Sequence, residues 1–348
     1  MIYFASDYSQ GAHPKILRAL EESNLEHCDG YGLDTHCKHA EEAIREMTGT
    51  ECSVHMMVGG TPCNVIMIAS ALRPYESVIS ARTGHIYAHE TGAIEATGHR
   101  IVTVDGVDGK LTPPLIDRAF EEYEDEHTLL PKMVYISQPT ELGTIYSRAE
   151  LEALFNKCRE RNCYLYIDGA RLGAALTCEK NDVSLRDIAR LCDAFYIGGT
   201  KNGALFGAAL VIVNREIDDH FRFMIKRQCG MLAKGRLLGV QFEALLEGGE
   251  DSVFFETARH ANKMAKIIRQ ELAKLGIEFY GNSPTNQVFP VLPTHIVEEL
   301  EKEFVFHRWA PERDKKVPVR FVCGWGTTIE EVERLTSAIK RLYGAEKR

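Results

Sequence analysis

The chain has 348 residues, more than a single hydrophobic core usually organises, so two unequal domains are expected. Its formal net charge of −9 argues against a nucleic-acid-binding protein, which normally presents a basic face. Its longest apolar stretch, residues 65–72, is too short to span a bilayer, and its first residues lack a signal-peptide pattern, so we expect a cytoplasmic protein with no membrane partner. Its ten cysteines form no CxxC pair, so we expect reduced thiols.

Apolar runs and helical patterns alternate over the first two thirds of the chain. Strands are predicted at residues 54–58, 100–104, 133–137, 164–167, 194–197 and 208–213, and helices from residue 61, from residue 112 through the acidic segment near Tyr123, and over 148–161 and 184–192. Continuous apolar strands that alternate with helices are typical of a mostly parallel sheet covered on both faces. The sequence therefore predicts an α/β fold for this part.

The pattern changes after Gly249. One long helix is predicted over residues 253–275, followed by short strands at 287–292, 304–308 and 319–322. The last helix is predicted to begin with a capping box at Thr327 and Glu330 and to stop at Gly344. We therefore expect an N-terminal arm at residues 1–14, a large α/β domain at 15–249 and a smaller α+β domain at 250–348.

The first candidate site follows a predicted strand, and ligands of open parallel sheets sit beyond the carboxyl ends of the strands. At VGGTPCN, residues 58–64, a strand runs into Gly59 and Gly60, and a helix begins at Thr61. The free N–H groups of that helix end and the Thr61 hydroxyl suit an anion such as phosphate. A plain strand–helix turn is the alternative.

Asp168 and Lys201 follow two successive predicted strands. Asp168 ends an apolar run and should be buried, so it needs a cationic or hydrogen-bonding partner. Arg171 in an ion pair is one candidate, and the protonated ring nitrogen of a bound cofactor is the other. Lys201, between Thr200 and a turn of small residues, is either a solvated lysine or a desolvated amine of lowered pKa that forms a Schiff base with a carbonyl.

His85 and His89 lie in a glycine-flanked loop, ARTGHIYAHETGA, at residues 81–93. One of them could stack on an aromatic ring or act as a base near neutral pH, and a hydrogen-bonded loop histidine is the alternative. Together the motifs offer an anion cradle, a carboxylate for a ring nitrogen, an amine for an aldehyde and a ring for stacking. Pyridoxal phosphate is the cofactor that needs all four.

The order and spacing of these motifs resemble the threonine aldolase/β-eliminating lyase family of pyridoxal-phosphate enzymes, over nearly the whole chain. The landmarks are SD at 6–7, YGLD at 31–34, GGT at 59–61, GHIYAHETGA at 84–93, DGAR at 168–171 and TKNG at 200–203. DGAR followed by the lysine turn is the most specific part. The resemblance implies the aspartate-aminotransferase-type fold (fold type I), with a mostly parallel central sheet, flanking helices and a smaller C-terminal α+β domain.

The resemblance also implies roles for single residues. Lys201 would hold the cofactor covalently, and Asp168 would bind its ring nitrogen. His85, a catalytic residue, would stack on the face of the ring. Gly60 and Thr61 would bind the phosphate, and Thr200, in the lysine turn, would also bind the cofactor. Arg171 would contact the cofactor or the substrate carboxylate. Arg320, in VPVRFVC, would grip that carboxylate with help from Ser6, since a guanidinium fork matches a carboxylate.

The implied activity is cleavage of a β-hydroxy-α-amino acid, of the threonine, allo-threonine or phenylserine type, to glycine and an aldehyde. A β-eliminating lyase or an aminotransferase acting on another small amino acid is the alternative. A catalytically silent binding protein is disfavoured because Lys201 and Asp168 are both present. The resemblance further implies a homodimer or homotetramer whose active sites lie at the subunit interface.

Two positions depart from the family pattern. Ala5 stands where the family often has an arginine, and the predicted strand end YISQPTELG, residues 135–143, lacks the histidine that threonine aldolases usually carry near Thr140. His89 or Glu141 could serve as a substitute base. Otherwise the substrate could be a bulkier β-hydroxy amino acid or one with a β-leaving group.

Two further tracts have open interpretations. Residues 26–39 contain three histidines, two cysteines and two aspartates, but their spacings fit no standard zinc pattern, so we expect no metal site. The resemblance places this tract near the cofactor end of a subunit interface. Lys226, Arg227 or Lys234 could reach a neighbouring subunit's phosphate, and a solvated charge run is the alternative.

Overall fold

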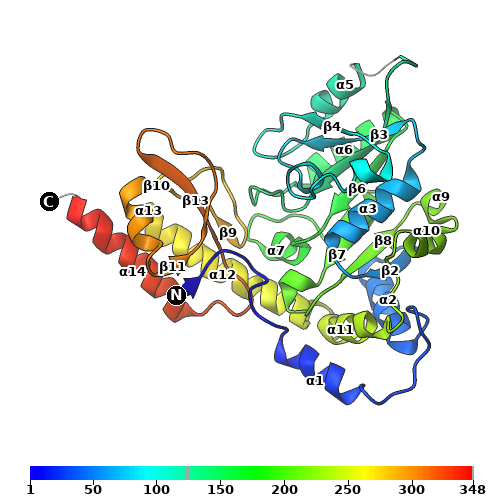
Figure 1. Cartoon of the computed structure of the whole chain (residues 1–348), viewed down its shortest axis with the longest axis horizontal. Helices are drawn as coiled ribbons and strands as arrows, with labels where there is room; N and C mark the ends of the chain where they lie inside the picture. The colour runs from blue at the N-terminus through cyan, green and yellow to red at the C-terminus, as the bar shows by residue number, and fades with distance from the viewer. Residues whose placement is uncertain (122–124, 347–348) are drawn as a thin grey trace.

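The computed structural model describes residues 1–121 and 125–346, and these form two parts joined side by side (Figure 1). The larger part is built on a seven-stranded sheet, and the smaller part carries the C-terminal helices. The predicted helix segment at Tyr123 lies outside the described residues. None of the described helices is long and apolar enough to cross a membrane.

The large sheet has the strand order β2-β8-β7-β6-β5-β3-β4. Its strands are β2 Ser53–Met57, β3 Glu76–Ala81, β4 Ile101–Val104, β5 Leu130–Ser137, β6 Tyr164–Asp168, β7 Ala194–Gly198 and β8 Ala208–Ile212. The pairings from β4 through β7 are parallel, and only β8 runs antiparallel to its neighbours. The sheet is therefore mostly parallel, as predicted, although the sequence analysis missed β3.

The two faces of this sheet are covered by different helices, because alternate strand residues point to opposite faces. Ile136 and Ile167 pack in one cluster with α5, α6 and α8, whereas Tyr135 and Tyr166 face α3 and α10. The helices of this part are α1 Pro14–Glu22, α2 Thr35–Thr48, α3 Gly60–Ala71, α4 His85–Ala88, α5 Pro113–Glu121, α6 Arg148–Glu160, α7 Leu172–Thr177, α8 Leu185–Arg190, α9 Arg215–Asp218, α10 Phe221–Arg227 and α11 Arg236–Leu246. Burial on both faces explains the continuous apolar strands.

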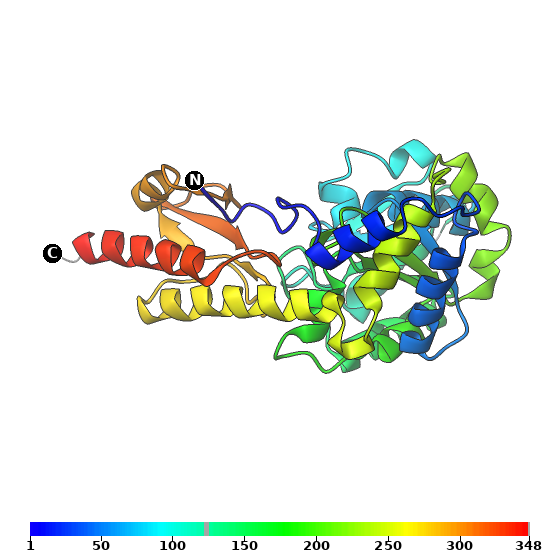
Figure 2. The same cartoon turned by 90° about the horizontal axis from the view of Figure 1, so that it is seen from below.

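The small part packs a short antiparallel sheet against two long helices that run side by side, α12 Val253–Lys274 and α14 Ile329–Glu346 (Figure 2). Its other elements are β9 Gln287–Val288, β10 Val291–Pro293, α13 Thr294–Leu300, β11 Phe304–Val305, β12 His307–Arg308 and β13 Lys316–Val322, with β13 paired to β9, β10 and β12. The predicted strands at 287–292 and 304–308 are each split in two. The last helix also extends past Gly344, so its predicted end was wrong.

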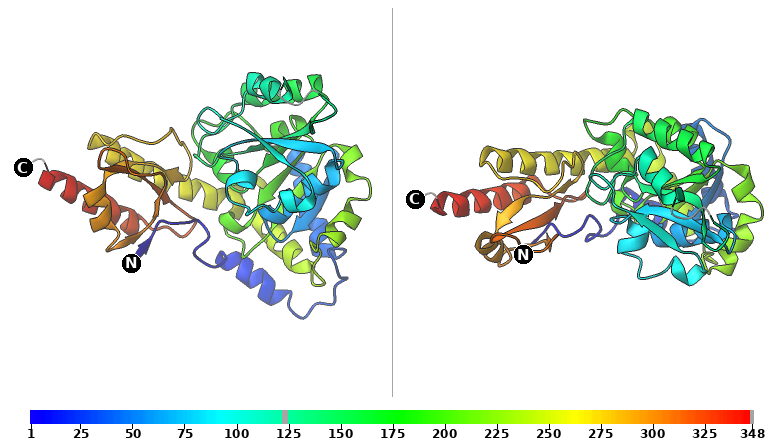
Figure 3. Two further views of the ribbon diagram at one scale, coloured as in Figure 1. Left: turned by 45° about the horizontal axis from the view of Figure 1, so that its top comes forward. Right: turned by 90° about the horizontal axis from the view of Figure 1, so that it is seen from above.

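The N-terminal segment crosses from the small part to α1 on the large part (Figure 3). Strand β1 Ile2–Tyr3 pairs in parallel with β11, and Ile2 and Phe4 are buried in the core of the small part. This segment therefore contacts both parts before the first helix begins. The division at residues 1–14, 15–249 and 250–348 stays a prediction.

Candidate active site

The candidate site lies at the carboxyl ends of β5, β6 and β7. Asp168 is the last residue of β6 and pairs in register with Ser137, the last residue of β5. Lys201 lies in the 3₁₀ turn Thr200–Asn202 that follows β7. The two side chains are within electrostatic reach of each other, and Arg171, Asp7 and Arg320 also act on Lys201. The structure thus gathers groups from both parts of the molecule at one place.

Asp168 is buried, as predicted, with 3% of its surface exposed. Its carboxylate accepts hydrogen bonds from the Tyr135 hydroxyl at 2.6 Å, the Tyr196 hydroxyl at 2.5 Å, the Asn64 amide at 3.3 Å and the Ala170 N–H at 2.9 Å. Sequence reasoning missed these partners, since the three side chains come from other elements. The one available signal was a tyrosine in each of the two strands that flank β6.

Arg171 is not the partner of Asp168, so that interpretation was wrong. Its Nε and Nη2 donate to the two carboxylate oxygens of Asp7, at 2.6 and 3.0 Å, and Asn286 also donates to Asp7 at 2.9 Å. Burial would raise the pKa of Asp7, but the Arg171 and Lys201 cations hold it below its ordinary value. The pair therefore joins the N-terminal segment to the strand end that carries Asp168.

Lys201 has the electrostatics of a reactive amine. Burial, reinforced by the Arg171 cation, lowers the pKa of Lys201 from 10.5 to about 8, although Asp7 and Asp168 act in the opposite direction. Its ammonium group lies 5.9 Å from the centre of the Tyr8 ring. A large fraction of Lys201 is neutral at mildly alkaline pH, and the neutral amine is the form that attacks a carbonyl.

Gly60 and Thr61 form the first turn of α3, whose N-cap, Gly59, makes no side-chain hydrogen bond. A Cβ built on Gly60 would lie 2.5 Å from the Tyr196 hydroxyl, so only glycine fits between this helix end and the residue that bonds Asp168. The N–H groups of the turn are available to an anion. Thr200 donates from its N–H and its hydroxyl to Gly207, which anchors the lysine turn.

His85 is linked to Asp168 by a chain of hydrogen bonds. Its Nδ1 lies 2.9 Å from Glu90 Oε1, which accepts from the Asn64 amide at 2.8 Å, and Asn64 in turn donates to Asp168. Burial alone would lower the pKa of His85, but Glu90 and Asp168 raise it above its ordinary value. The His89 ring is 5.5 Å away and its pKa is lowered, first by burial and then by His85. Glu90 was missed by the sequence analysis.

Arg320, on β13, reaches toward the N-terminal segment. Its guanidinium stacks at 4.7 Å on the Trp309 ring and contacts the Ala5 carbonyl at 3.4 Å, while its buried Nε has no partner. Burial, reinforced by Arg171, lowers the pKa of Arg320 to about 10. Such an underused fork suits a carboxylate ligand. Ser6, the residue after Ala5, is half-buried with its hydroxyl 3.3 Å from that of Ser9.

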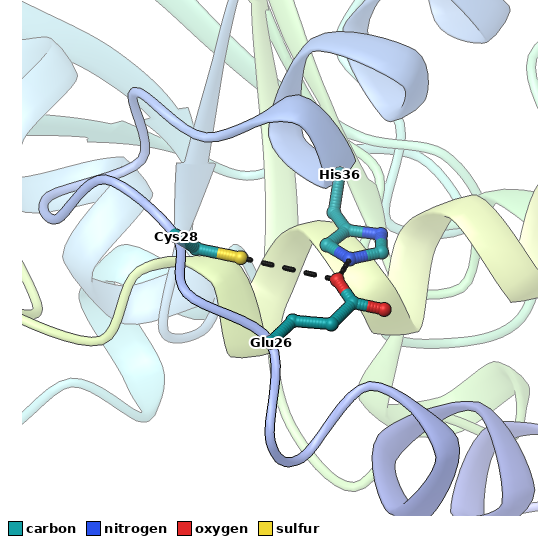
Figure 4. A group of neighbouring side chains, drawn as sticks. All are labelled: Glu26, Cys28 and His36. Atoms are coloured by element: carbon teal, nitrogen blue, oxygen red, sulfur yellow. Dashed lines mark hydrogen bonds and ion pairs between the residues drawn. The ribbon is translucent and has the colours of Figure 1, made fainter.

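The tract at residues 26–39 forms a hydrogen-bonded cluster on α11. The ligand atoms of Glu26, Cys28 and His36 lie within 4.8 Å of one another (Figure 4). His36 bridges two carboxylates, at 2.8 Å to Glu26 and 2.6 Å to Glu243, and these raise its pKa although burial lowers it. Arg236 lies 3.7 Å from the Cys28 sulfur. These contacts tie the loop to α11, and the absence of a metal site stays a prediction.

The three basic residues Lys226, Arg227 and Lys234 are exposed at the end of α10 and in the loop after it. The Lys226 ammonium lies 4.7 Å from the centre of the Tyr31 ring. Tyr31 belongs to the YGLD motif, so this surface and that motif are neighbours. A contact with a neighbouring subunit stays a prediction.

Residues 4–294 match the family model described as Beta-eliminating lyase. The low specificity L-threonine aldolase of Pseudomonas aeruginosa is 31% identical over 349 residues, which cover 98% of each chain, and that of Escherichia coli K12 is 24% identical over 70% of this chain and 74% of its own.

Solved structures are similar as well. A structure of Leishmania major threonine aldolase has a TM-score of 0.96 and 44% sequence identity, and covers 99% of this chain and 100% of its own. An aspartate aminotransferase from Thermus thermophilus, solved with maleate, has a TM-score of 0.73 at 18% identity, and covers 98% of this chain and 91% of its own. The second likeness concerns the fold alone, and it confirms the predicted fold class.

Proposed function

The chain belongs to the beta-eliminating lyase family, and we propose that it cleaves a β-hydroxy-α-amino acid of the threonine type to glycine and an aldehyde with pyridoxal phosphate as cofactor. The observation that carries the proposal is the placement of the half-buried Lys201, whose pKa is lowered to about 8, within electrostatic reach of the buried Asp168 at adjacent strand ends. The names of its relatives as threonine aldolases support the substrate class.

The residues at the site fit this cofactor. The neutral amine of Lys201 would attack its aldehyde, Asp168 would meet its ring nitrogen, and the helix end at Gly60 and Thr61 leaves room and N–H groups for its phosphate. His85, held by Glu90, would cover the ring. When bound, the cofactor supplies an electron sink for the α-carbon.

The substrate carboxylate would bind between the two arginines. Arg320 keeps a buried, unpartnered Nε, and Arg171 is fixed in place by its bidentate contact with Asp7. Ser6 would add a hydroxyl donor from the N-terminal segment. Because the cations come from both parts of the molecule, substrate binding would depend on the position of the small part relative to the large one.

We also propose an oligomer with sites at the subunit interface, in which Lys226, Arg227 or Lys234 reaches the neighbour's phosphate. Their exposure beside Tyr31 supports this. A cytoplasmic location is supported by the ten free cysteines, most of which are buried. Sedimentation of the cofactor-loaded protein at several concentrations tests the assembly, and a monomer at all of them would contradict it.

The test of the activity is product analysis with the cofactor-loaded enzyme. L-threonine should yield glycine and acetaldehyde in equal amounts, and Lys201→Ala should abolish both. Lys274→Met, a change on the exposed side of α12, is the matched control. Formation of 2-oxobutanoate from threonine, or of pyruvate from serine, without glycine release would instead identify a β-eliminating enzyme and refute the proposal.

A further inference from the structure

Glu141, which the sequence analysis offered with His89 as a possible substitute base, is a carboxylic acid fixed at the edge of the site. Its Oε1 accepts two hydrogen bonds, from the Ser137 hydroxyl at 2.7 Å and from the His85 N–H at 2.9 Å. The first donor ends β5 beside Asp168, and the second begins α4. Both bonds converge on one oxygen, so they fix the orientation of the carboxyl group and leave Oε2 outside this pair of bonds.

Glu141 lies where a base is missing from the family pattern. It lies in the strand-end segment where the family pattern predicts a histidine near Thr140 and this chain has none. We propose that Glu141 is the base that takes the proton of the substrate's β-hydroxyl group, an inference that rests on the proposed function. Its second oxygen, which accepts neither of these two bonds, would receive that proton.

The step balances without any further reactant. The O–H bond of the β-hydroxyl breaks and its proton passes to Glu141, while the oxygen forms a carbonyl as the Cα–Cβ bond breaks. The electron pair of that bond stays with the α-carbon, which takes up one proton and becomes the methylene of glycine. No net oxidation or reduction occurs, so no oxidant is needed.

The surroundings of Glu141 make its carboxylate a stronger base than an exposed one. Burial raises the pKa of Glu141 above its ordinary value, and the Asp168 charge adds to this, whereas the Ser137 hydrogen bond and His85 lower it. Arg171, Tyr135 and Tyr146 also face it within electrostatic reach. A carboxylate of raised pKa is a stronger base than an exposed one.

The histidines are weaker candidates for this step. His85 is held by Glu90 through its Nδ1, and its ring would cover the cofactor, so it is less free to reach the β-hydroxyl group. His89 is exposed, burial and then His85 lower its pKa, and its ring packs at 5.5 Å on that of His85. It is the rival that the experiment must exclude.

The decisive variant is Glu141→Gln in the cofactor-loaded enzyme. The amide oxygen of glutamine still accepts from His85 and Ser137, but the amide takes no proton. We expect kcat for threonine cleavage to fall by about 10²–10⁴-fold, the usual contribution of a general base. The cofactor absorbance, KM and the exchange of the α-proton of glycine in D₂O should change little, since glycine has no β-hydroxyl. Glu247→Gln, on an exposed ion pair with Lys15, is the control.

A second variant keeps the base and changes its pKa. Ser137→Ala removes a hydrogen bond that lowers the pKa of Glu141, so the acidic limb of the kcat profile for threonine should move to higher pH. A merely structural role of Ser137 would lower kcat at all pH values without moving this limb. An unmoved limb would therefore contradict the assignment, even if Glu141→Gln did not fold.

The outcomes separate the two claims. If the wild-type enzyme releases no glycine from threonine, the proposed function fails. If the wild type is active and Glu141→Gln keeps its kcat, or loses glycine exchange as well as cleavage, the proposed function stands and the role of Glu141 is refuted. Loss of cleavage in His89→Asn with full activity in Glu141→Gln would assign the base to His89 instead.

Discussion

Lys201 is a half-buried, desolvated cation near the Arg171 cation, so its replacement by methionine should stabilise the cofactor-free protein. The pKa of Lys201 falls from 10.5 to about 8 on folding, chiefly through burial. At about 1.4 kcal/mol per pH unit, this difference corresponds to about 3 kcal/mol of lost stability at pH 7. Methionine is an unbranched apolar side chain that fills similar space without a charge, so Lys201→Met should recover most of that free energy.

The pH dependence gives the prediction its sign. The folded-state pKa lies below the unfolded one, so the unfolded chain binds more protons between about pH 8 and 10.5. The stability of the wild type therefore rises with pH across this window relative to the variant. The advantage of Lys201→Met should be full below about pH 8 and should disappear near pH 10.5.

The assay is urea denaturation of both proteins after removal of the cofactor, at pH 7 and at pH 9.5. Lys274→Met, at a lysine whose side chain is 70% exposed, is the control and should change the free energy of unfolding little at either pH. Equal stability of Lys201→Met and the wild type at pH 7 would refute the reasoning. So would a gain that does not shrink at pH 9.5, because such a gain would come from packing rather than charge.

Two further predictions concern the surroundings of this lysine. Asp7→Asn should lower the free energy of unfolding by about 3–5 kcal/mol, because it leaves Arg171 buried without its carboxylate, and urea denaturation against the wild type would measure it; a loss below 1 kcal/mol would contradict it. Gly60→Ala should weaken cofactor binding at least about tenfold, since its Cβ would lie 2.5 Å from the Tyr196 hydroxyl. An absorbance titration would show this, with Gly11→Ala, whose Cβ would meet open space, as the control that should bind normally.

The strands that position the site were predictable because they are buried on both faces. The apolar runs that end at Asp168 and before Lys201 carry no polar residue that would interrupt a core strand, and each run ends next to a candidate site residue. Strand β3 was missed because it contains polar residues although it is buried. Its sequence, ESVISA, contains a glutamate and two serines, and all six residues are buried. Glu76 is satisfied by the Arg73 N–H at 2.7 Å, a contact that periodicity does not reveal.

The start of the last helix shows how local signals can compete. The sequence offers two overlapping capping boxes, Thr327 with Glu330 and Thr328 with Glu331, and the first was predicted. The structure uses the second: the Thr328 N–H donates to Glu331 at 2.9 Å, and the Glu331 N–H donates to the Thr328 hydroxyl at 3.2 Å. The Thr327 hydroxyl already accepts the Gly324 N–H at 2.9 Å, so it is not available as a cap. The turn between Gly324 and Thr327 therefore decided which of the two capping boxes forms.

The partners of Asp168 and Arg171 could not be read from the sequence, because they depend on which distant elements meet. Asp7 lies 164 residues from Arg171 in the chain, and Tyr196 lies 28 residues after Asp168. A buried carboxylate and a nearby arginine suggest an ion pair by proximity in sequence. In the fold, however, three neutral side chains satisfy Asp168, and Arg171 turns to the N-terminal segment.

The pairing of Arg171 with Asp7 affects how the site is assembled. Lys201, Arg171 and Arg320 bring three cations together, and the pKa values of Lys201 and Arg320 both fall. Asp7 opposes this repulsion at all three, and it is also held by the Asn286 amide of the small part. Because Asp7 belongs to the N-terminal segment, the cations can gather only when that segment, the large sheet and the small part are all in place. The catalytic charge arrangement is therefore a property of the complete fold, and the large part alone would hold Lys201 beside an unpaired Arg171.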